Sequence, residues 1–526
     1  MKNELRSLGF NFDGPIVNRS SLDERAEASG LDQTYDNGKF RYHYTTTGSN
    51  AVDDTDDDSN GIPDYIDQMA ETFEYVEDIE LTTNGFVEPP GDDWYPSNYD
   101  NGGSGAYDVY VRNAGGGVYG NVQPEHYANN TGNNEHSSGT TEENAMTSYM
   151  VMRHNYNGFP NSLTENIQVT AAHEYFHAVQ MGYDNWEETW VMEATAVQME
   201  EIVYDNINDC YQYMSSWFNN PQQSLNLDSS SRWYGSFIFF EYVNSHLSEE
   251  SIRTFWEQSI THDSYHGDYS VQTLDEAFDD LGSSFAEMLN GMSVANRIMS
   301  SASAVSPWDY EEADSYAVTP STFSTVSFTA GGNETVSSTN LQENAAQYIR
   351  LTTDDPVLAT LANDAGPDSY LELHAIMTYG DSAWTVWSGS PINVDPTDAT
   401  QVYFVVVSQN DAGSDFDYTL TFTDGEMSTE PEIPLHFAVS NAYPNPFNPQ
   451  TNINVDLAAD QKIQVHIYDI QGRLVQTLYD GELNVGSHIL TWDGSAMNGK
   501  AVPSGTYFVR LNGDGMESWQ KVTLLK

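Results

Sequence analysis

The sequence predicts a multidomain protein, with an α+β domain first, an all-β sandwich domain second and a small β-sandwich last. A length of 526 residues leaves room for three or four domains at about 150 residues each. Apolar residues follow helical spacing from 162 to about 289, whereas short runs of Val, Thr, Tyr and Phe recur after about 315. The boundaries we expect are an N-terminal extension at 1–40, the α+β domain at 41–312, the sandwich domain at 315–425, a linker at 426–440 and the last module at 441–526.

The α+β domain is expected to begin with a strand. Residues 40–47 read F-R-Y-H-Y-T-T-T and alternate as a strand does, and residues 65–79 carry apolar side chains at helical spacing. Short strands are expected at 107–111 and 149–152, before the mostly helical part of the chain. The domain therefore combines a small sheet with a larger set of helices.

The composition excludes several classes of partner. The chain has 18 Lys+Arg and 79 Asp+Glu, so its formal net charge is 18 − 79 = −61. Such a polyanion repels nucleic acid and anionic lipid, and it suits a saline setting that screens its self-repulsion. Cys210 is the only cysteine, so no internal disulfide can form. The longest apolar runs, such as 402–407, are far shorter than the roughly 18 residues of a membrane span.

The main chemical motif is H-E-Y-F-H at residues 173–177. Residues four apart lie on one face of a helix, so His173 and His177 could bind one metal ion while Glu174 reaches a water molecule beside it. Ser162 followed by Glu165 is a capping-box pattern, which predicts that this helix begins just after Ser162. The alternative is a helix with two histidines that serve only its surface or core.

A third ligand is expected from the following segment, T-W-V-M-E-A-T-A-V-Q-M-E-E. Catalytic zinc takes three protein ligands and keeps one position open. Glu193 lies in the first turn of a second helical pattern and can complete a His–His–Glu set from an antiparallel neighbour, although it is one acid among 79. The other acids nearby are expected on solvated faces, namely Glu187, Glu188, Glu200 and Glu201.

These two segments resemble the gluzincin metallopeptidases, whose second helix carries a W-x-x-E-G/A ligand motif. The chain more closely resembles a group of secreted bacterial metallopeptidases, through F-R-Y-H-Y-T-T-T-G, D-S-N-G-I-P-D-Y-I-D, V-T-A-A-H-E-Y-F-H-A-V-Q and W-V-M-E-A-T-A-V-Q-M-E-E between about 40 and 201. The resemblance implies a zincin-like metallopeptidase fold for 41–312, with His173, His177 and Glu193 as zinc ligands. It also implies that Glu174 is the general base.

A donor for the developing oxyanion is expected beyond the second helix. Gluzincin aminopeptidases use a Tyr at the start of a helix, and the segment R-W-Y-G-S-F-I-F-F-E-Y-V offers Tyr234 in a similar place, with a different spacing to its Gly. A core or surface role for Tyr234 fits the sequence equally well. His262 and His266 are the other candidates.

A calcium loop is expected at 56–67, within the acidic stretch at 53–67. The register matches the ligand positions of an EF-hand loop, with Gly61 at its sixth position. An Asp at position 12 and Pro63 are similar to thrombospondin-type-3 or dockerin-like loops, and the alternative is a solvated acidic loop. The expected ligands are Asp56, Asp58, Asn60, Ile62 through its carbonyl, Asp64 and Asp67.

The last module predicts where the protein goes. Residues 441–526 contain N-A-Y-P-N-P-F-N-P-Q-T, T-W-D-G, P-S-G-T-Y-F-V-R-L and a terminal K-V-T-L-L-K, which are similar to the type A C-terminal sorting domain of the type IX secretion system of Bacteroidota-like bacteria. The resemblance implies an immunoglobulin-like sandwich, export by that machinery, and a secreted or cell-surface protein. The start of the chain has no signal peptide and alone predicts a cytoplasmic protein, so we expect it to be truncated, wrongly assigned or already processed.

Taken together, the sequence predicts a secreted zinc peptidase, most simply an endopeptidase, that also binds Ca²⁺ and acts on proteins or peptides. The competing hypothesis is a calcium-stabilised surface adhesin or glycan-binding protein that keeps a degenerate peptidase domain. The β domain at 315–425 motivates that alternative, whereas the intact H-E-x-x-H speaks against it.

Overall fold

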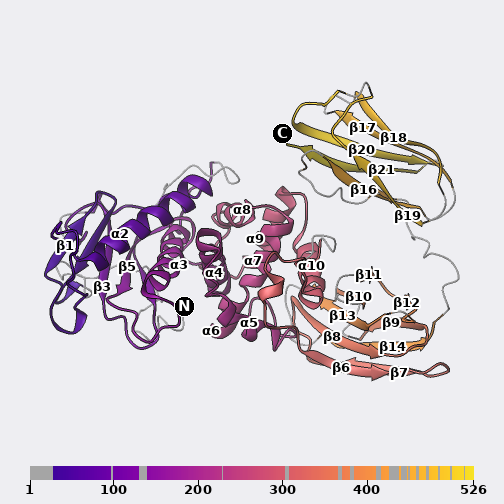
Figure 1. The fold of residues 1–526 in the computed structure, drawn as a ribbon, viewed down its shortest axis with the longest axis horizontal. Helices are drawn as coiled ribbons and strands as arrows, with labels where there is room; N and C mark the ends of the chain where they lie inside the picture. The colour runs from indigo at the N-terminus through magenta and orange to yellow at the C-terminus, as the bar shows by residue number, and fades with distance from the viewer. Residues whose placement is uncertain are drawn as a thin grey trace. The chain divides into compact units, whose positions relative to one another are not determined.

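The computed structural model forms two compact units, residues 1–425 and 426–526, and Figure 1 shows their elements. It describes residues 28–95, 99–128, 139–227, 229–301, 307–364, 370–379, 384–397, 399–409, 416–425, 438–439, 447, 450–457, 461–469, 473–483, 486–497, 500–513 and 516–525. Most of the predicted extension at 1–40, most of the linker at 426–440 and most of the motif at 441–451 lie outside these ranges. Among the described residues, no helix combines the length and apolar composition needed to cross a bilayer.

The first unit opens with a five-stranded mixed sheet in the order β1-β2-β3-β5-β4. The central strands run parallel, whereas β1 and β4 are antiparallel to their neighbours at the two edges. Helix α2 (Asp64–Glu77) continues into a π-helical turn, Asp78–Thr83. The strands are β1 (Gln33–Asp36), β2 (Phe40–Tyr44), β3 (Tyr107–Arg112), β4 (Gly120–Tyr127) and β5 (Met146–Arg153).

This sheet confirms the predicted strands and helix and adds two strands. β1 lies inside the predicted N-terminal extension, which is therefore wrong for Gln33–Asp36. Residues 37–39 link β1 to β2, and Gly38 has a φ of 96°, as a tight hairpin turn requires. β4 was not predicted, because Pro124 and mostly polar neighbours give it a weak strand pattern.

After the sheet, the described residues between 163 and 298 form eight α-helices, in the region where the sequence predicts mostly helical structure; Figure 1 shows how they are arranged. α3 packs against α2, β5 and α4, so it lies between the sheet and the remaining helices. The helices are α3 (Leu163–Tyr183), α4 (Thr189–Tyr204), α5 (Tyr211–Phe218), α6 (Ser230–Gly235), α7 (Phe237–His246), α8 (Ser251–Ser259), α9 (Ser270–Asp280) and α10 (Phe285–Ile298).

A β-sandwich completes the first unit, as predicted for this part of the chain. Its sheets have the orders β11-β10-β13-β8-β6 and β12-β9-β14-β7. The strands are β6 (Thr322–Ser327), β7 (Glu334–Ser338), β8 (Ala345–Thr352), β9 (Val357–Asn363), β10 (Leu371–Thr378), β11 (Trp384–Ser388), β12 (Ile392–Val394), β13 (Gln401–Ser408) and β14 (Tyr418–Asp424).

The central strand β13 of the larger sheet is buried on both faces. Along β13, Val402, Phe404 and Val406 belong to the core between the two sheets, whereas Tyr403 and Val405 belong to the core shared with the helices. This alternation follows from the two-residue period of a strand. The larger sheet therefore contributes to two cores, one inside the sandwich and one shared with the helices. The shared core joins the two parts, and residues 1–425 form a single unit.

The second unit is a separate small sandwich. Its sheets have the orders β15-β16-β19 and β18-β17-β20-β21. Phe447 is the described residue of the N-A-Y-P-N-P-F-N-P-Q segment that enters the core, and its N–H donates to Thr523 O at 2.8 Å. The strands are β15 (Ala438–Val439), β16 (Thr451–Leu457), β17 (Gln461–Asp469), β18 (Leu474–Leu483), β19 (Gly486–Trp492), β20 (Gly505–Gly513) and β21 (Met516–Leu524).

Candidate metal centre

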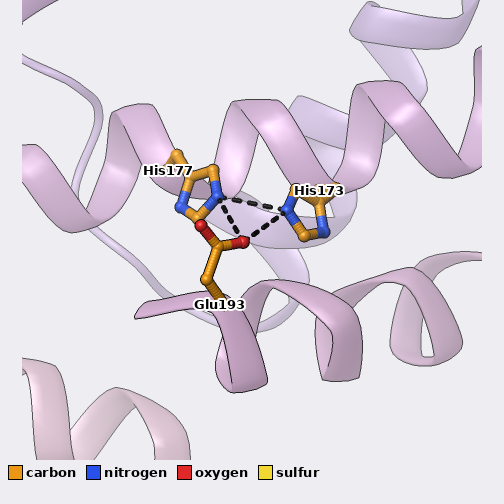
Figure 2. A group of neighbouring side chains, drawn as sticks. All are labelled: His173, His177 and Glu193. Atoms are coloured by element: carbon orange, nitrogen blue, oxygen red, sulfur yellow. Dashed lines mark hydrogen bonds and ion pairs between the residues drawn. The ribbon is translucent and has the colours of Figure 1, made fainter. Parts of the chain in front are cut away.

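Two neighbouring helices carry the predicted ligands. α3 begins with the expected capping box, because Glu165 N–H donates to Ser162 Oγ at 3.3 Å and Ser162 N–H donates to Glu165 Oε2 at 2.9 Å. α4 packs beside α3. Figure 2 shows the imidazole rings of His173 and His177 extending from one helix toward the carboxylate of Glu193 on the other.

The three side chains converge at one point. Nε2 of His173 lies 3.1 Å from Nε2 of His177 and 3.2 Å from Oε2 of Glu193. Nε2 of His177 lies 3.5 Å from the same Glu193 oxygen. Ligand atoms of a tetrahedral zinc ion with bonds of about 2.0–2.1 Å would be about 3.3–3.4 Å apart. The triad can therefore hold a zinc-sized cation without rearrangement. A cation between them would also remove the unfavourable contact between the two Nε2 atoms, which otherwise face each other.

The far ring nitrogens also have partners. Nδ1 of His173 lies 2.8 Å from Oε1 of Glu200, and Nδ1 of His177 lies 2.7 Å from Oε1 of Gln180. Sequence reasoning identified neither partner. Two signals were present: Glu200 follows Glu193 by two helical turns, and Gln180 follows His177 by about one turn, so each lies on the face of the ligand that precedes it.

The predicted solvent exposure of the acids near Glu193 is wrong for three of the four. Glu187, Glu200 and Glu201 are buried, and Glu188 is half-buried. Both faces of α4 are covered, because α3 packs on one side and α6 and α7 pack on others. Glu200 and Glu201 of this helix are therefore buried although they follow each other in sequence.

Electrostatics within the triad favour a charged cluster. Burial lowers the pKa of His173, but hydrogen bonds to Glu193 and Glu200 outweigh it, so the net pKa is well above the ordinary value. Burial raises the pKa of Glu193, yet His177 and His173 together bring it well below the usual range. Glu193 therefore remains a carboxylate, which is the form that binds a metal ion.

Glu174 lies beside the triad in a confined space. It is 6 % exposed, and burial raises the pKa of its carboxyl, against the opposing effect of the two histidines. Gly120 of β4 faces it closely, because a Cβ atom at this glycine would lie 2.9 Å from Glu174 Cγ and 3.1 Å from Glu174 Oε1. The backbone of an edge strand therefore borders the space around this carboxylate.

Tyr234 of α6 lies against the same cluster. Its ring is 6.0 Å from that of His173 and stacks on Tyr213 at 4.9 Å. The charge of Glu193, followed by burial, raises the pKa of the Tyr234 phenol well above its ordinary value. The other two candidates are engaged elsewhere, since His262 pairs with Glu276 at 2.8 Å and His266 with Asp263 at 2.7 Å.

Arg232 fixes the chain just before Tyr234. Its guanidinium is buried and donates to backbone carbonyls of the α5–α6 region, at 2.7 Å to Ser224 O and 3.1 Å to Asn220 O, and also to Gln223 O. It stacks over the Trp217 ring at 4.0 Å. Residues 220–224 thus pack around the Arg232 side chain of α6, the helix that carries Tyr234.

The predicted calcium loop brings some of its residues together. One carboxylate oxygen each from Asp56, Asp58 and Asp64 lies within 4.8 Å of the others. Asn60 donates to Asp67 Oδ2 at 2.9 Å, while its own oxygen accepts from Ile62 N–H at 2.7 Å. The three aspartates are the part of the loop that could hold a cation. The Asn60 amide forms hydrogen bonds within the loop instead.

Comparison with known proteins identifies the last unit. The model of the FlgD Ig-like domain matches residues 440–515. The basal-body rod modification protein FlgD of Salmonella typhimurium is 44% identical over 50 residues, 10% of this chain and 22% of FlgD. FlgD of Escherichia coli is 38% identical over 60 residues, 11% of this chain and 26% of that protein. The chain thus spans about a quarter of these relatives and carries a C-terminal Ig-like domain.

Two solved structures from Porphyromonas gingivalis are also similar. PorZ, a surface component of the type IX secretion system, is 22% identical with a TM-score of 0.13, covering 20% of this chain and 14% of PorZ. Dimeric latent PorU is 13% identical with a TM-score of 0.17, covering 33% of this chain and 18% of PorU. These TM-scores are too low to indicate a shared overall fold.

Proposed function

We propose that this chain is a secreted zinc peptidase. The observation that carries the proposal is the convergence of His173, His177 and Glu193, whose ligand atoms lie 3.1–3.5 Å apart in a buried site. These three residues would hold the zinc ion. Bound there, zinc would supply a Lewis acid that polarises a substrate carbonyl and activates water.

The chain's own groups divide the remaining work. Glu174 accepts a proton from the attacking water and passes it to the leaving amine, a role favoured by its raised pKa. Tyr234 keeps its phenolic proton near neutral pH, because its pKa is raised. Its hydroxyl can therefore donate a hydrogen bond to the oxyanion that forms on the substrate.

The sheet offers a place for an extended substrate. β4 is the last strand in the sheet order of the described residues and is antiparallel to β5. An edge strand presents N–H and C=O groups that can pair with a peptide backbone. Gly120 of this strand lies against Glu174, so a peptide paired along β4 would pass close to the general base.

We extend the proposal to calcium and to export. Asp56, Asp58 and Asp64 would bind Ca²⁺, which neutralises three close carboxylates just before α2. The C-terminal Ig-like domain would act as the sorting domain recognised by the type IX secretion machinery, as its sequence motifs suggest. The protein would then act outside the cell or on its surface.

The test uses the full chain loaded with zinc. We expect about one zinc ion per chain, casein cleavage by the wild type, and a loss of at least about 100-fold in kcat for Glu174→Gln with zinc retained. Zinc-loaded wild type that cleaves neither casein nor any member of a peptide library would refute the peptidase. Specific binding to cells or polysaccharide that survives zinc removal would instead favour the adhesin.

A further inference from the structure

We propose that Gln180 and Glu200 are positioning residues that fix the tautomers of His177 and His173, so that both rings present Nε2 to the same cation. This inference rests on the proposed zinc site and names the groups that orient its ligands. A neutral imidazole carries its proton on one ring nitrogen only, and the hydrogen bond made by that nitrogen decides which one it is.

The surroundings of Gln180 determine the orientation of its amide. Its Nε2 donates to the carbonyl of Met192 at 2.8 Å, and a carbonyl can only accept a hydrogen bond. Nε2 also donates to Thr195 Oγ1 at 3.0 Å, because the Thr195 hydroxyl donates its own proton to Val191 O at 2.7 Å. The amide nitrogen must therefore face α4, and the oxygen must face His177.

This orientation sets the proton on His177. The Gln180 oxygen lies 2.7 Å from Nδ1 of His177 and can only accept, so Nδ1 carries the proton and Nε2 keeps its lone pair. Gln180 is fully buried, so water cannot supply an alternative partner. One amide thus connects the backbone of α4 to the ring of a ligand on α3.

Glu200 performs the same role for His173. Its Oε1 accepts from Nδ1 of His173 at 2.8 Å, and the residue is 4 % exposed. In the neutral ring that binds a metal ion, Nε2 of His173 then keeps its lone pair and faces the other two ligand atoms. Glu200 of α4 orients one imidazole directly, and Gln180 of α3 orients the other while its amide is held by Met192 and Thr195 of α4. The packing of α4, which also supplies Glu193, on α3 thus assembles the whole ligand set.

Zinc affinity and the ring protonation of the full chain test this inference. We expect Gln180→Met and Glu200→Met to weaken the zinc Kd by about 10–100-fold, measured by competition with a chromophoric chelator. Gln180→Glu keeps an acceptor for His177 but loses the donors to Met192 and Thr195. It should therefore retain the Nδ1–H tautomer, seen by NMR of 15N-histidine-labelled protein, and bind zinc more tightly than Gln180→Met.

Gln198→Met is the matched control. Gln198 is a buried amide on the same helix, and it donates to Glu241 Oε2 at 2.7 Å; its loss should reduce stability but leave the zinc Kd unchanged. If Gln180→Glu is as weak as Gln180→Met and has lost the tautomer, or if both Met variants bind zinc like the control, the inference is wrong. A wild type that binds no zinc would instead refute the proposed function.

Discussion

Gly120 places a backbone where a side chain would collide with the proposed general base. A Cβ atom there would lie 2.9 Å from Glu174 Cγ and 3.0 Å from Thr170 Cγ2. These are shorter than ordinary contacts, so even an alanine would move the carboxylate. The position of Glu174 therefore depends on a glycine that lies more than 50 residues away in sequence.

We predict that Gly120→Ala lowers kcat on casein by about 10–100-fold, since small misplacements of a reacting group have effects of that size. The zinc Kd should stay unchanged, because the ligands are elsewhere. Gly116→Ala is the control, since a Cβ atom there meets nothing within 4 Å. Equal activity of the two variants would show that Glu174 tolerates the contact.

Glu201 gives a prediction about pH. Burial raises the pKa of its carboxyl to about 8, from an ordinary value of 4.5, and nearby carboxylates contribute. Between these values the folded state keeps the proton and the unfolded state loses it, so the free energy of unfolding falls as pH rises across this window. Across the whole window the free energy of unfolding should fall by about 3–5 kcal/mol, at about 1.4 kcal/mol per pKa unit.

Glu201→Gln should remove this dependence. Urea unfolding from pH 5 to pH 8 should show a shallower decline for the variant than for the wild type, and the variant should gain most at pH 8. Glu249→Gln, at an exposed position, should follow the wild type. Parallel curves for Glu201→Gln and the wild type would contradict the burial argument.

The sequence alone points to the three proposed zinc ligands, which the fold brings together, but not to the residues around them. His173 and His177 could be paired from their spacing alone, and Glu193 from its place in the next helix. Glu200 could not be separated from other acids, because its role depends on burial by several helices at once. Gly120 could not be found either, since only the folded sheet brings it to Glu174.

At the scale of single elements, the loop before α2 concentrates negative charge at the start of a helix. Asp56, Asp58 and Asp64 place carboxylate oxygens within 4.8 Å of one another, and Gly61, with a φ of 92°, allows the turn between them. Like charges at this distance oppose folding unless a cation or protons neutralise them. The loop and α2 should therefore respond together to calcium.

We predict that millimolar Ca²⁺ raises the Tm of the wild type, because a ligand that binds only the folded state stabilises it. Asp58→Asn should largely abolish the increase. Asp57→Asn is the control, since this substitution removes the same charge from an exposed residue that is not one of the expected calcium ligands. A similar calcium effect in both variants would mean that general screening, rather than a bound ion, is responsible.

The helical and strand elements were predictable where their periodicity was strong. α3 begins where its capping box indicates, and β2, β3 and β5 lie where the sequence predicts short strands. β4 was missed because an edge strand with Pro124 has no clear alternation. The strand that borders the site is thus one of the two that the local sequence pattern does not reveal.

At the scale of the whole molecule, the helices and the first sandwich depend on each other. Tyr348 donates to Ser293 O of α10 at 2.8 Å, and the Arg297 guanidinium lies 3.8 Å from the centroid of the Tyr403 ring. The run at 402–407 is apolar at every position, which indicates a strand buried on both faces. That run is the sequence signal that the predicted boundary near 312–315 does not divide two independent bodies.

We predict that a chain shortened to residues 1–425 unfolds cooperatively with a Tm close to that of the same unit in the full chain. A chain shortened to residues 1–312 should bind a hydrophobic dye and aggregate, because α10 loses the sheet that covers it. Thermal unfolding and light scattering would measure both. A soluble, cooperatively folded 1–312 chain would show that the sandwich is dispensable.

The carbonyl groups around Arg232 have a consequence for the effect of salt on the site. The hydrogen-bond partners of its guanidinium, among the described residues, are backbone oxygens rather than carboxylates. Mobile ions weaken attraction between exposed charges but hardly affect a buried cation held by short-range dipoles. The segment that leads to Tyr234 should therefore keep its conformation from low to high salt concentration, while salt screens the repulsion among the exposed acidic side chains.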